Sequence, residues 1–179
     1  MLIMESSASH YSVCDRYATY FENIKGKPWS QTHAGARWEM SWEDELNIAP
    51  LVSGHLGRVG NEKPEDFCFD FWYMGYRMDP KATCSARPDV PNGLVLGRDK
   101  VRAGVIYLLG DYVGSFFPHR LQASKMTLPM RFRFRGWEIG DPSLFRNFDD
   151  VVPNCVVRDA DKLRTREELD EYLRTGKLK

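Results

Sequence analysis

The segment from Met130 to Arg135 places the strongest constraint on the fold, because its side chains alternate strictly between apolar and cationic. The apolar positions are Met130, Phe132 and Phe134, and the cationic positions are Arg131, Arg133 and Arg135. Successive side chains of a β-strand point to opposite faces of the sheet. The pattern therefore predicts a strand with one buried face and one cationic face.

Two more strands are expected just before this one. Val105 to Leu109 is apolar at every position, which is typical of a strand that is covered on both faces. Gly110-Asp111 predicts a turn, and Tyr112 to Phe117 predicts the returning strand. Pro118 ends that strand, because its nitrogen carries no hydrogen to donate to a neighbouring strand. We therefore expect a hairpin at the centre of the sheet.

Further patterns predict strands at Ala36 to Trp42, Leu94 to Leu96 and Asn154 to Val157, and the longest strand at Phe67 to Met78. Apolar stripes with capping residues predict a helix at each end of the chain. The first runs from a cap at Ser7 through Lys25. The second begins at a capping box of Thr165 and Glu168 and ends at Gly176.

Together these elements predict an α+β fold, mostly antiparallel, with an N-terminal and a C-terminal helix. The sheet is expected to form a small barrel or a strongly curved sheet of the lipocalin-like or cone-like kind. The chain of 179 residues fits a single domain, with the core sheet at about 36–139 and a C-terminal extension and helix at 140–179. The strongest apolar segments predict one interior. It consists of Trp38, Trp42, Phe69, Phe71, Val105, Tyr107 and Phe132.

The charge balance and the apolar content of the chain argue against nucleic acid and membranes as binding partners. The 25 basic and 25 acidic residues cancel, so no long-range field attracts nucleic acid or an anionic membrane. No segment approaches the ~20 apolar residues that span a bilayer, and no signal peptide is recognisable, which predicts a cytoplasmic protein without a membrane partner. The four cysteines and four histidines are dispersed, so we expect no metal and no cofactor, although ligands can also be assembled in space.

Asp70 is the only charged residue in the apolar stretch from Phe67 to Tyr76. Burial would raise its pKa, because a carboxylate loses hydration there. Three interpretations follow: an ion pair with an arginine of the Met130–Arg135 strand, a general acid or base in a cavity, or exposure through a different register. Asp79-Pro80-Lys81, nearby, resembles the carboxylate-x-lysine motif of metal-dependent nucleases. That motif normally lies in an apolar strand, and a proline at its centre argues against this interpretation.

We expect a cofactor-independent enzyme that acts on a small molecule as an isomerase, cyclase, dehydratase or decarboxylase, and that is therefore a lyase or an isomerase. A homodimer is one option for its oligomeric state. It would act by proton transfer on an apolar, oxygen-bearing substrate inside a β-barrel cavity. The expected catalytic residues are Asp70, His119 and Tyr107. The expected substrate-binding residues are Trp38, Trp42, Trp72, Tyr76, Arg131 and Arg133.

The alternative is a non-catalytic binding module that recognises an anionic ligand, nucleic acid or a protein partner through the face of Arg131, Arg133 and Arg135. The balanced charge argues against nucleic acid. The direction of the arginines distinguishes the two hypotheses. Arginines that point inward with Asp70 favour the enzyme, and arginines that point outward beside Trp137 favour the module.

Overall fold

The computed structural model describes residues 2–48, 70–83, 93–113 and 129–178. Its helices are α1 (Tyr11–Lys25), α2 (Trp29–Leu46) and α5 (Arg166–Thr175). A five-stranded sheet has the order β1-β6-β5-β3-β2, with β1 at Ile3–Ser6, β2 at Phe71–Tyr73, β3 at Tyr76–Thr83, β5 at Val105–Tyr112 and β6 at Met130–Ile139. A three-stranded sheet has the order β4-β8-β7, with β4 at Gly93–Gly97, β7 at Arg146–Asn147 and β8 at Cys155–Asp159.

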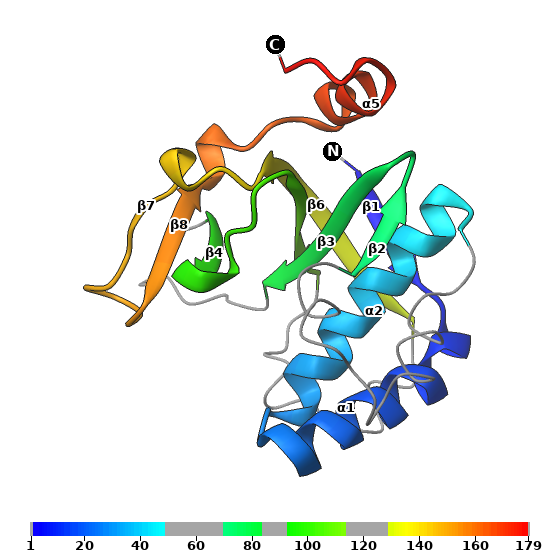
Figure 1. Cartoon of the computed structure of the whole chain (residues 1–179). Helices are drawn as coiled ribbons and strands as arrows, with labels where there is room; N and C mark the ends of the chain where they lie inside the picture. The colour runs from blue at the N-terminus through cyan, green and yellow to red at the C-terminus, as the bar shows by residue number, and fades with distance from the viewer. Residues whose placement is uncertain (1, 49–69, 84–92, 114–128, 179) are drawn as a thin grey trace.

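The fold is α+β, and its larger sheet is strongly curved into a half-barrel, as the sequence predicts. All strand pairs of the described residues are antiparallel except β3 with β5, which run parallel. Figure 1 shows α1 and α2 side by side at one end of the molecule, the three-stranded sheet to the left, and α5 at the top. No helix in the described ranges is long and apolar enough to cross a membrane.

The alternation in β6 is realised as predicted. Met130, Phe132 and Phe134 are buried in a cluster with residues of α2 and α5, whereas Arg131 is exposed. A bulge between Leu109 and Gly110 of β5 shifts the register, so the later residue Trp137 joins the same apolar face. The helices therefore cover one face of the five-stranded sheet.

The opposite face of the sheet carries a second apolar cluster. There Val105 and Tyr107 of β5 pack against Leu94, Leu96 and Val156 of the smaller sheet. The prediction of a single interior is therefore wrong, because β5 is buried on both faces and separates two cores. Phe69 lies outside the described residues.

The predicted strand at Ala36–Trp42 is wrong, because this segment belongs to α2. Ala34, Trp38 and Trp42 recur every four residues, and all three are buried against the sheet. A spacing of four fits a helix stripe as well as one side of a strand. The Nε1 atom of Trp38 donates to the carbonyl oxygen of Leu108 at 3.1 Å, which fixes α2 on β5.

The predicted turn at Gly110-Asp111 is also wrong, since β5 continues through it to Tyr112. Glycine is required there for close packing: a Cβ atom would lie 2.5 Å from Cε2 of Trp38. In the structure β5 pairs with β3 on one side and with β6 on the other. The second half of the predicted hairpin, residues 114–117, lies outside the described residues.

Residues 70–78, the described part of the predicted long strand Phe67–Met78, form a hairpin in the structure, and residues 67–69 lie outside the described residues. Met74 and Gly75 turn the chain between β2 and β3 with φ angles of 50° and 84°. Two positive φ angles are typical of a two-residue hairpin turn whose twist matches its strands. Met-Gly is an unusual pair for such a turn, so no pattern in the sequence predicts it.

Both terminal helices agree with their predictions. Ser7 caps a short 3-10 turn, Ala8–His10, that leads into α1, and Gly26 ends the helix in a left-handed conformation. Thr165 and Glu168 form the expected capping box of α5. Reciprocal side-chain bonds at a helix start are local in sequence, which is why they can be read directly from it.

Candidate functional site

Strand β3 presents Asp79 and Lys81 on the face opposite to that of Met78, which belongs to the first apolar cluster. In the parallel pair, Asp79 lies beside Tyr107 of β5, whose side chain belongs to the second apolar cluster. Lys81 is two residues further along and shares that face. The Asp79-Pro80-Lys81 motif therefore lies inside a strand of the main sheet, so the objection raised from the sequence does not hold.

Pro80 is tolerated in β3 because no described residue pairs with it on the side of β2. The carbonyl oxygen of Met78 accepts a hydrogen bond from Asp70 N at 2.9 Å, so the polar groups of Met78 face β2. Residues two apart in a strand direct their backbone groups to the same side. The nitrogen of Pro80 consequently faces a side where no described strand pairs with β3, and its missing hydrogen costs no ladder bond.

Asp70 and Glu39 reach the motif from two other elements. Asp70 immediately precedes β2, and its backbone bond to Met78 holds it beside the start of the motif. Glu39 belongs to α2, which packs against β3. Electrostatic coupling of Asp70 to Glu39, Asp79 and Lys81 shows that the four groups form one cluster. We call these four residues the carboxylate cluster.

Two members of the carboxylate cluster hold protons more tightly than usual. Burial raises the pKa of Asp70 well above its ordinary range, and the negative charges of Glu39 and Asp79 raise it further. Burial, opposed by the charge of Lys81, raises the pKa of Glu39 to about 8. Like charges held close together and away from water favour the protonated form. The cluster therefore has too little positive charge to keep all of its carboxyl groups ionised.

Lys81 supplies one positive charge through an ion pair with Asp79. Burial alone would lower the pKa of Lys81, but the charges of Asp79 and Asp70 outweigh that effect and raise it. The side chain of Lys81 keeps 39% of its exposure and that of Asp79 only 8%, so the cluster opens to solvent on the lysine side. Oδ2 of Asp70 is buried and has no hydrogen-bond partner among the described residues.

A divalent cation fits these residues chemically. No three His, Cys, Asp or Glu side chains of the described chain converge in the geometry of a metal site. Mg²⁺ does not require three, because it is commonly held by one or two carboxylates, waters and substrate phosphates. The raised pKa values of Asp70 and Glu39 indicate that the cluster holds too little positive charge to keep all three carboxyl groups ionised, and a bound cation would supply that charge.

Further cations lie close to the carboxylate cluster. Burial lowers the pKa of Lys27, and the charges of Lys100 and Lys81 lower it further. Lys27 follows α1, and Lys100 belongs to the 3-10 turn Arg98–Lys100 that precedes β5. Both side chains remain accessible to solvent, so the loss of hydration at Lys27 is partial. A local patch of positive charge therefore borders the cluster although the net charge of the chain is zero.

The three predicted catalytic residues do not lie together in one site of the described structure. Asp70 is in the carboxylate cluster, and His119 lies outside the described residues. Tyr107 lies beside Asp79, but its hydroxyl donates to Lys100 O at 2.6 Å and accepts from Arg102 N at 2.9 Å. That hydroxyl holds the turn before β5. The catalytic roles of these residues stay predictions.

The predicted substrate-binding residues do not form one group. Trp38 and Trp42 are fully buried under the sheet, and Tyr76 packs its ring 5.2 Å from that of Tyr172 in α5. Trp72, in contrast, is exposed on β2. The binding roles of these residues are likewise untested predictions.

The row of arginines in β6 pairs with Asp111 rather than with Asp70. Asp111 of β5 accepts from Arg133 at 2.9 Å and from Arg135 at 2.6 Å, across the two strands. The hypothesis of an ion pair between Asp70 and this row is therefore wrong. The row also lies on the face opposite Trp137. The arginines therefore neither point inward with Asp70, as expected for the enzyme, nor lie beside Trp137, as expected for the binding module.

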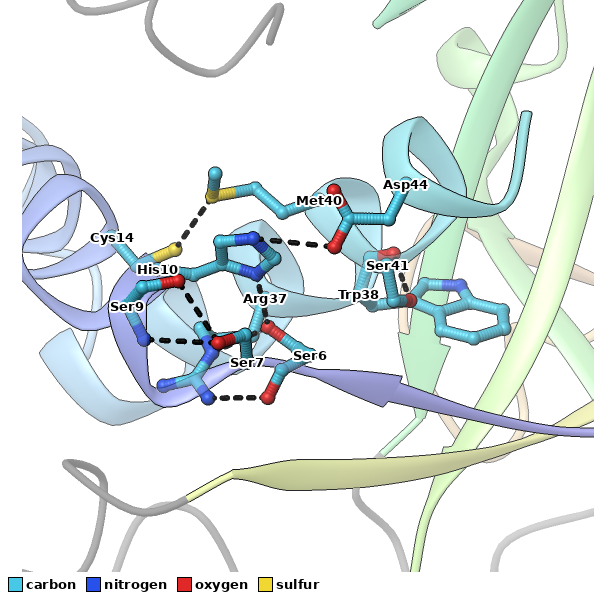
Figure 2. A network of polar contacts seen from close by, with 10 residues as sticks. All are labelled: Ser6, Ser7, Ser9, His10, Cys14, Arg37, Trp38, Met40, Ser41 and Asp44. Atoms are coloured by element: carbon cyan, nitrogen blue, oxygen red, sulfur yellow. Dashed lines mark hydrogen bonds and ion pairs between the residues drawn. The ribbon is translucent and has the colours of Figure 1, made fainter. Parts of the chain in front are cut away.

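A second polar cluster joins β1, α1 and α2 (Figure 2). Ser6 Oγ lies 2.9 Å from His10 Nδ1, and His10 Nε2 lies 3.3 Å from Asp44. This order resembles a serine nucleophile with its base, but Ser6 is fully buried and accepts from Arg37 Nε at 2.6 Å. Arg37 also donates to Ser6 O at 2.8 Å. The cluster therefore holds the first strand onto the helices.

The pH dependence of stability offers a first test of the carboxylate cluster. Glu39 binds its proton in the folded state up to a pH of about 8, whereas its ordinary pKa is 4.5. The stability that this proton contributes is present below the ordinary pKa and is lost as the pH rises through about 8. We expect the melting temperature to fall by several degrees between pH 5.5 and 8.5, at ~2–4 °C per kcal/mol.

The matched variant is Glu39→Gln, which keeps the shape of the side chain and removes its titration. Thermal unfolding of this variant should show a flatter pH profile than the parent over the same window. Equal slopes for the two proteins would show that Glu39 does not carry the shifted proton.

Comparison of the chain with family models, curated proteins and solved structures finds no match.

Proposed function

We propose that the protein is a divalent-cation-dependent phosphodiesterase that hydrolyses nucleic acid at the carboxylate cluster. The observation that supports this proposal is the grouping of Glu39, Asp70 and Asp79 with Lys81, in which a buried carboxylate oxygen is left without a partner. A group of carboxylates around one lysine can bind a divalent cation, and the cation can in turn bind an anionic substrate. The group is open to solvent on the lysine side, so such a substrate could reach it.

Each residue has a role that follows from its surroundings. Asp70 and Asp79 would hold the cation, which when bound polarises a phosphoryl oxygen of the substrate. Lys81 can donate up to three hydrogen bonds and would stabilise the charge that develops on the phosphoryl oxygens. Glu39, with a pKa of about 8, is suited to take the proton of the attacking water near neutral pH.

The proposal departs from the sequence expectation in two respects, the cation and the nucleic acid. The expectation about nucleic acid rested on zero net charge, which describes the whole chain. Lys27, Lys81 and Lys100 nevertheless form a local positive patch beside the acids. Phosphate groups respond to such local charge, because fields from distant charges are screened within about 8 Å at physiological salt.

The small-molecule enzyme expected from the sequence remains the second candidate. One observation favours it: Asp70 and Glu39 both have raised pKa values, which suit general acid–base catalysis without a cation. The two candidates differ in their requirement for a divalent ion, so one experiment separates them.

The experiment incubates the purified chain with labelled DNA and RNA oligonucleotides in Mg²⁺, in Mn²⁺ and in EDTA. We expect cleavage with either cation and none in EDTA, together with a rise in melting temperature when the cation is added without substrate. Asp150→Asn, at an exposed position outside the cluster, is the control and should behave as the parent. Absence of cleavage under all conditions, with no thermal response to either cation, would contradict the proposal.

A further inference from the structure

The face of the five-stranded sheet that carries the Asp79-Pro80-Lys81 motif is covered at one end and open at the other. The smaller sheet covers the end near Glu138 of β6, which is fully buried and pairs with Arg158 of β8 at 2.8 Å. At the other end, Ile3 of β1 and Arg131 of β6 are exposed. Figure 1 shows the start of β6 at the lower right, away from the smaller sheet. Part of this face is therefore accessible to a partner.

The open end carries the three arginines of β6, Arg131, Arg133 and Arg135, which we call the arginine row. The side chain of Arg133 keeps 41% of its exposure, and Arg131 is exposed. Arg133 and Arg135 both pair with Oδ2 of Asp111, and one carboxylate cannot neutralise two guanidinium groups. Arg131 has no ion-pair partner among the described residues, although Glu5 of β1 lies opposite it in the register. The row therefore keeps an excess of positive charge.

The arginine row and the carboxylate cluster lie on the same face of the sheet. Lys81 of β3 is the Cα partner of Leu109 in β5, and Asp111, two residues further along β5, is the partner of Arg133 in β6. Neighbouring strands are ~4.8 Å apart and residues two apart along a strand are ~6.6 Å apart, so Lys81 and Arg133 are separated by ~12 Å. The side chain of Lys81 keeps 39% of its exposure, so both ends of this path are accessible.

The chemistry of the row fits the backbone of a nucleic acid. Guanidinium groups bind phosphate through two parallel hydrogen bonds and are weakly hydrated, which makes arginine well suited to phosphate contacts. Arg131 and Arg133 repeat at ~6.6–7 Å along the strand, on an open face rather than in a closed cavity. An extended polyanion matches such a row better than a small anion does, because it can contact several arginines at once.

We propose that the arginine row binds backbone phosphates of the substrate strand about three nucleotides from the bond that is cleaved, at ~3.4 Å per nucleotide. This inference rests on the proposed function and adds a second contact region to it. The enzyme would then prefer polynucleotides to dinucleotides, because a dinucleotide at the carboxylate cluster is too short to reach Arg133. Phosphate contacts carry no sequence information, so the row would accept any sequence.

The test compares Arg131→Ala with Arg174→Ala. Arg174 is an exposed arginine of α5, the helix that packs on the opposite face of the sheet. Binding of fluorescein-labelled dT15 is measured by anisotropy in EDTA, where no cleavage is expected. Arg131→Ala should weaken binding by about 3- to 10-fold and lower the slope of log Kd against log salt by ~0.7, because one phosphate contact is lost. Arg174→Ala should bind as the parent does.

Two further measurements separate a contact with the strand from an effect on the catalytic site. In Mg²⁺, Arg131→Ala should raise KM for dT15 by about the same factor and leave kcat unchanged. It should also leave the slower cleavage of the dinucleotide dTpdT unchanged. A dT15 probe with uncharged methylphosphonate linkages should bind equally weakly to the parent and to Arg131→Ala.

The outcomes distinguish this inference from the proposed function. Equal binding and equal KM for Arg131→Ala and Arg174→Ala would overturn the role of the row, while cation-dependent cleavage by the parent still supports the proposed function. An equal loss of dTpdT and dT15 cleavage in Arg131→Ala would also overturn it, because the variant would then act on the catalytic site. Binding of dT15 that depends on Arg131, without cleavage by the parent in Mg²⁺ or Mn²⁺, would support the row as a binding surface and overturn the proposed function.

Discussion

Asp70→Asn is expected to keep the fold and to lose cation-dependent hydrolysis by ~10²–10⁴-fold. Burial and neighbouring acids already raise the pKa of Asp70, so the folded protein favours its neutral form. Asparagine has the same shape and no charge, which relieves repulsion from Glu39 and Asp79. The melting temperature should therefore equal or exceed that of the parent at pH 8, whereas an amide cannot supply the charge that a divalent cation needs.

Asp111→Asn is the matched control for this loss. Asp111 lies on β5, beside the β3 strand that carries Asp79 and Lys81, and on the same face of the sheet, but it pairs with Arg133 and Arg135 rather than with the carboxylate cluster. Its replacement should lower stability and leave hydrolysis within a few-fold of the parent. Circular dichroism and steady-state cleavage at saturating Mg²⁺ measure the two quantities. If Asp70→Asn unfolds while Asp111→Asn is inactive but stable, the roles of the two carboxylates are reversed.

Local signals in the sequence predicted the elements that depend on neighbours in the chain. The capping box of Thr165 and Glu168 and the alternation around Phe132 involve residues within a few positions of each other, and both were confirmed. The fold class followed from these elements. The bulge after Leu109 and the parallel pairing of β3 with β5 depend on distant contacts, so no local pattern indicated them.

The candidate site was only partly predictable for the same reason. Asp70 stood out because it is a charge in an apolar stretch, and this signal is local. Glu39 was missed because its segment was assigned to a strand, and a spacing of four between Trp38 and Trp42 fits both structures. Lys81 was set aside because of Pro80, whose tolerance in β3 depends on how that strand is paired. That pairing is a tertiary feature.

The face assignment of β6 can be tested by a large effect on stability. Phe132→Ala is expected to lower the free energy of unfolding by ~3–5 kcal/mol, because its fully buried ring contacts two other aromatic residues. Its centroid lies 5.3 Å from that of Trp38 and 5.9 Å from that of Tyr112. The cavity would open between α2 and the sheet, where Trp38 already packs against Gly110 and has little freedom to move.

Arg131→Ala is the control on the adjacent residue, which is exposed on the other face of the same strand. It should change the free energy of unfolding by ~0.5 kcal/mol or less, as surface substitutions usually do. Urea unfolding at constant pH gives both values, and similar slopes with denaturant would show that the exposed area is unchanged. A large loss for Arg131→Ala and a small one for Phe132→Ala would mean that the cationic face is the buried one. The arginine row would then lie in the core and Asp111 would be its structural partner there, which the exposure of Arg131 argues against.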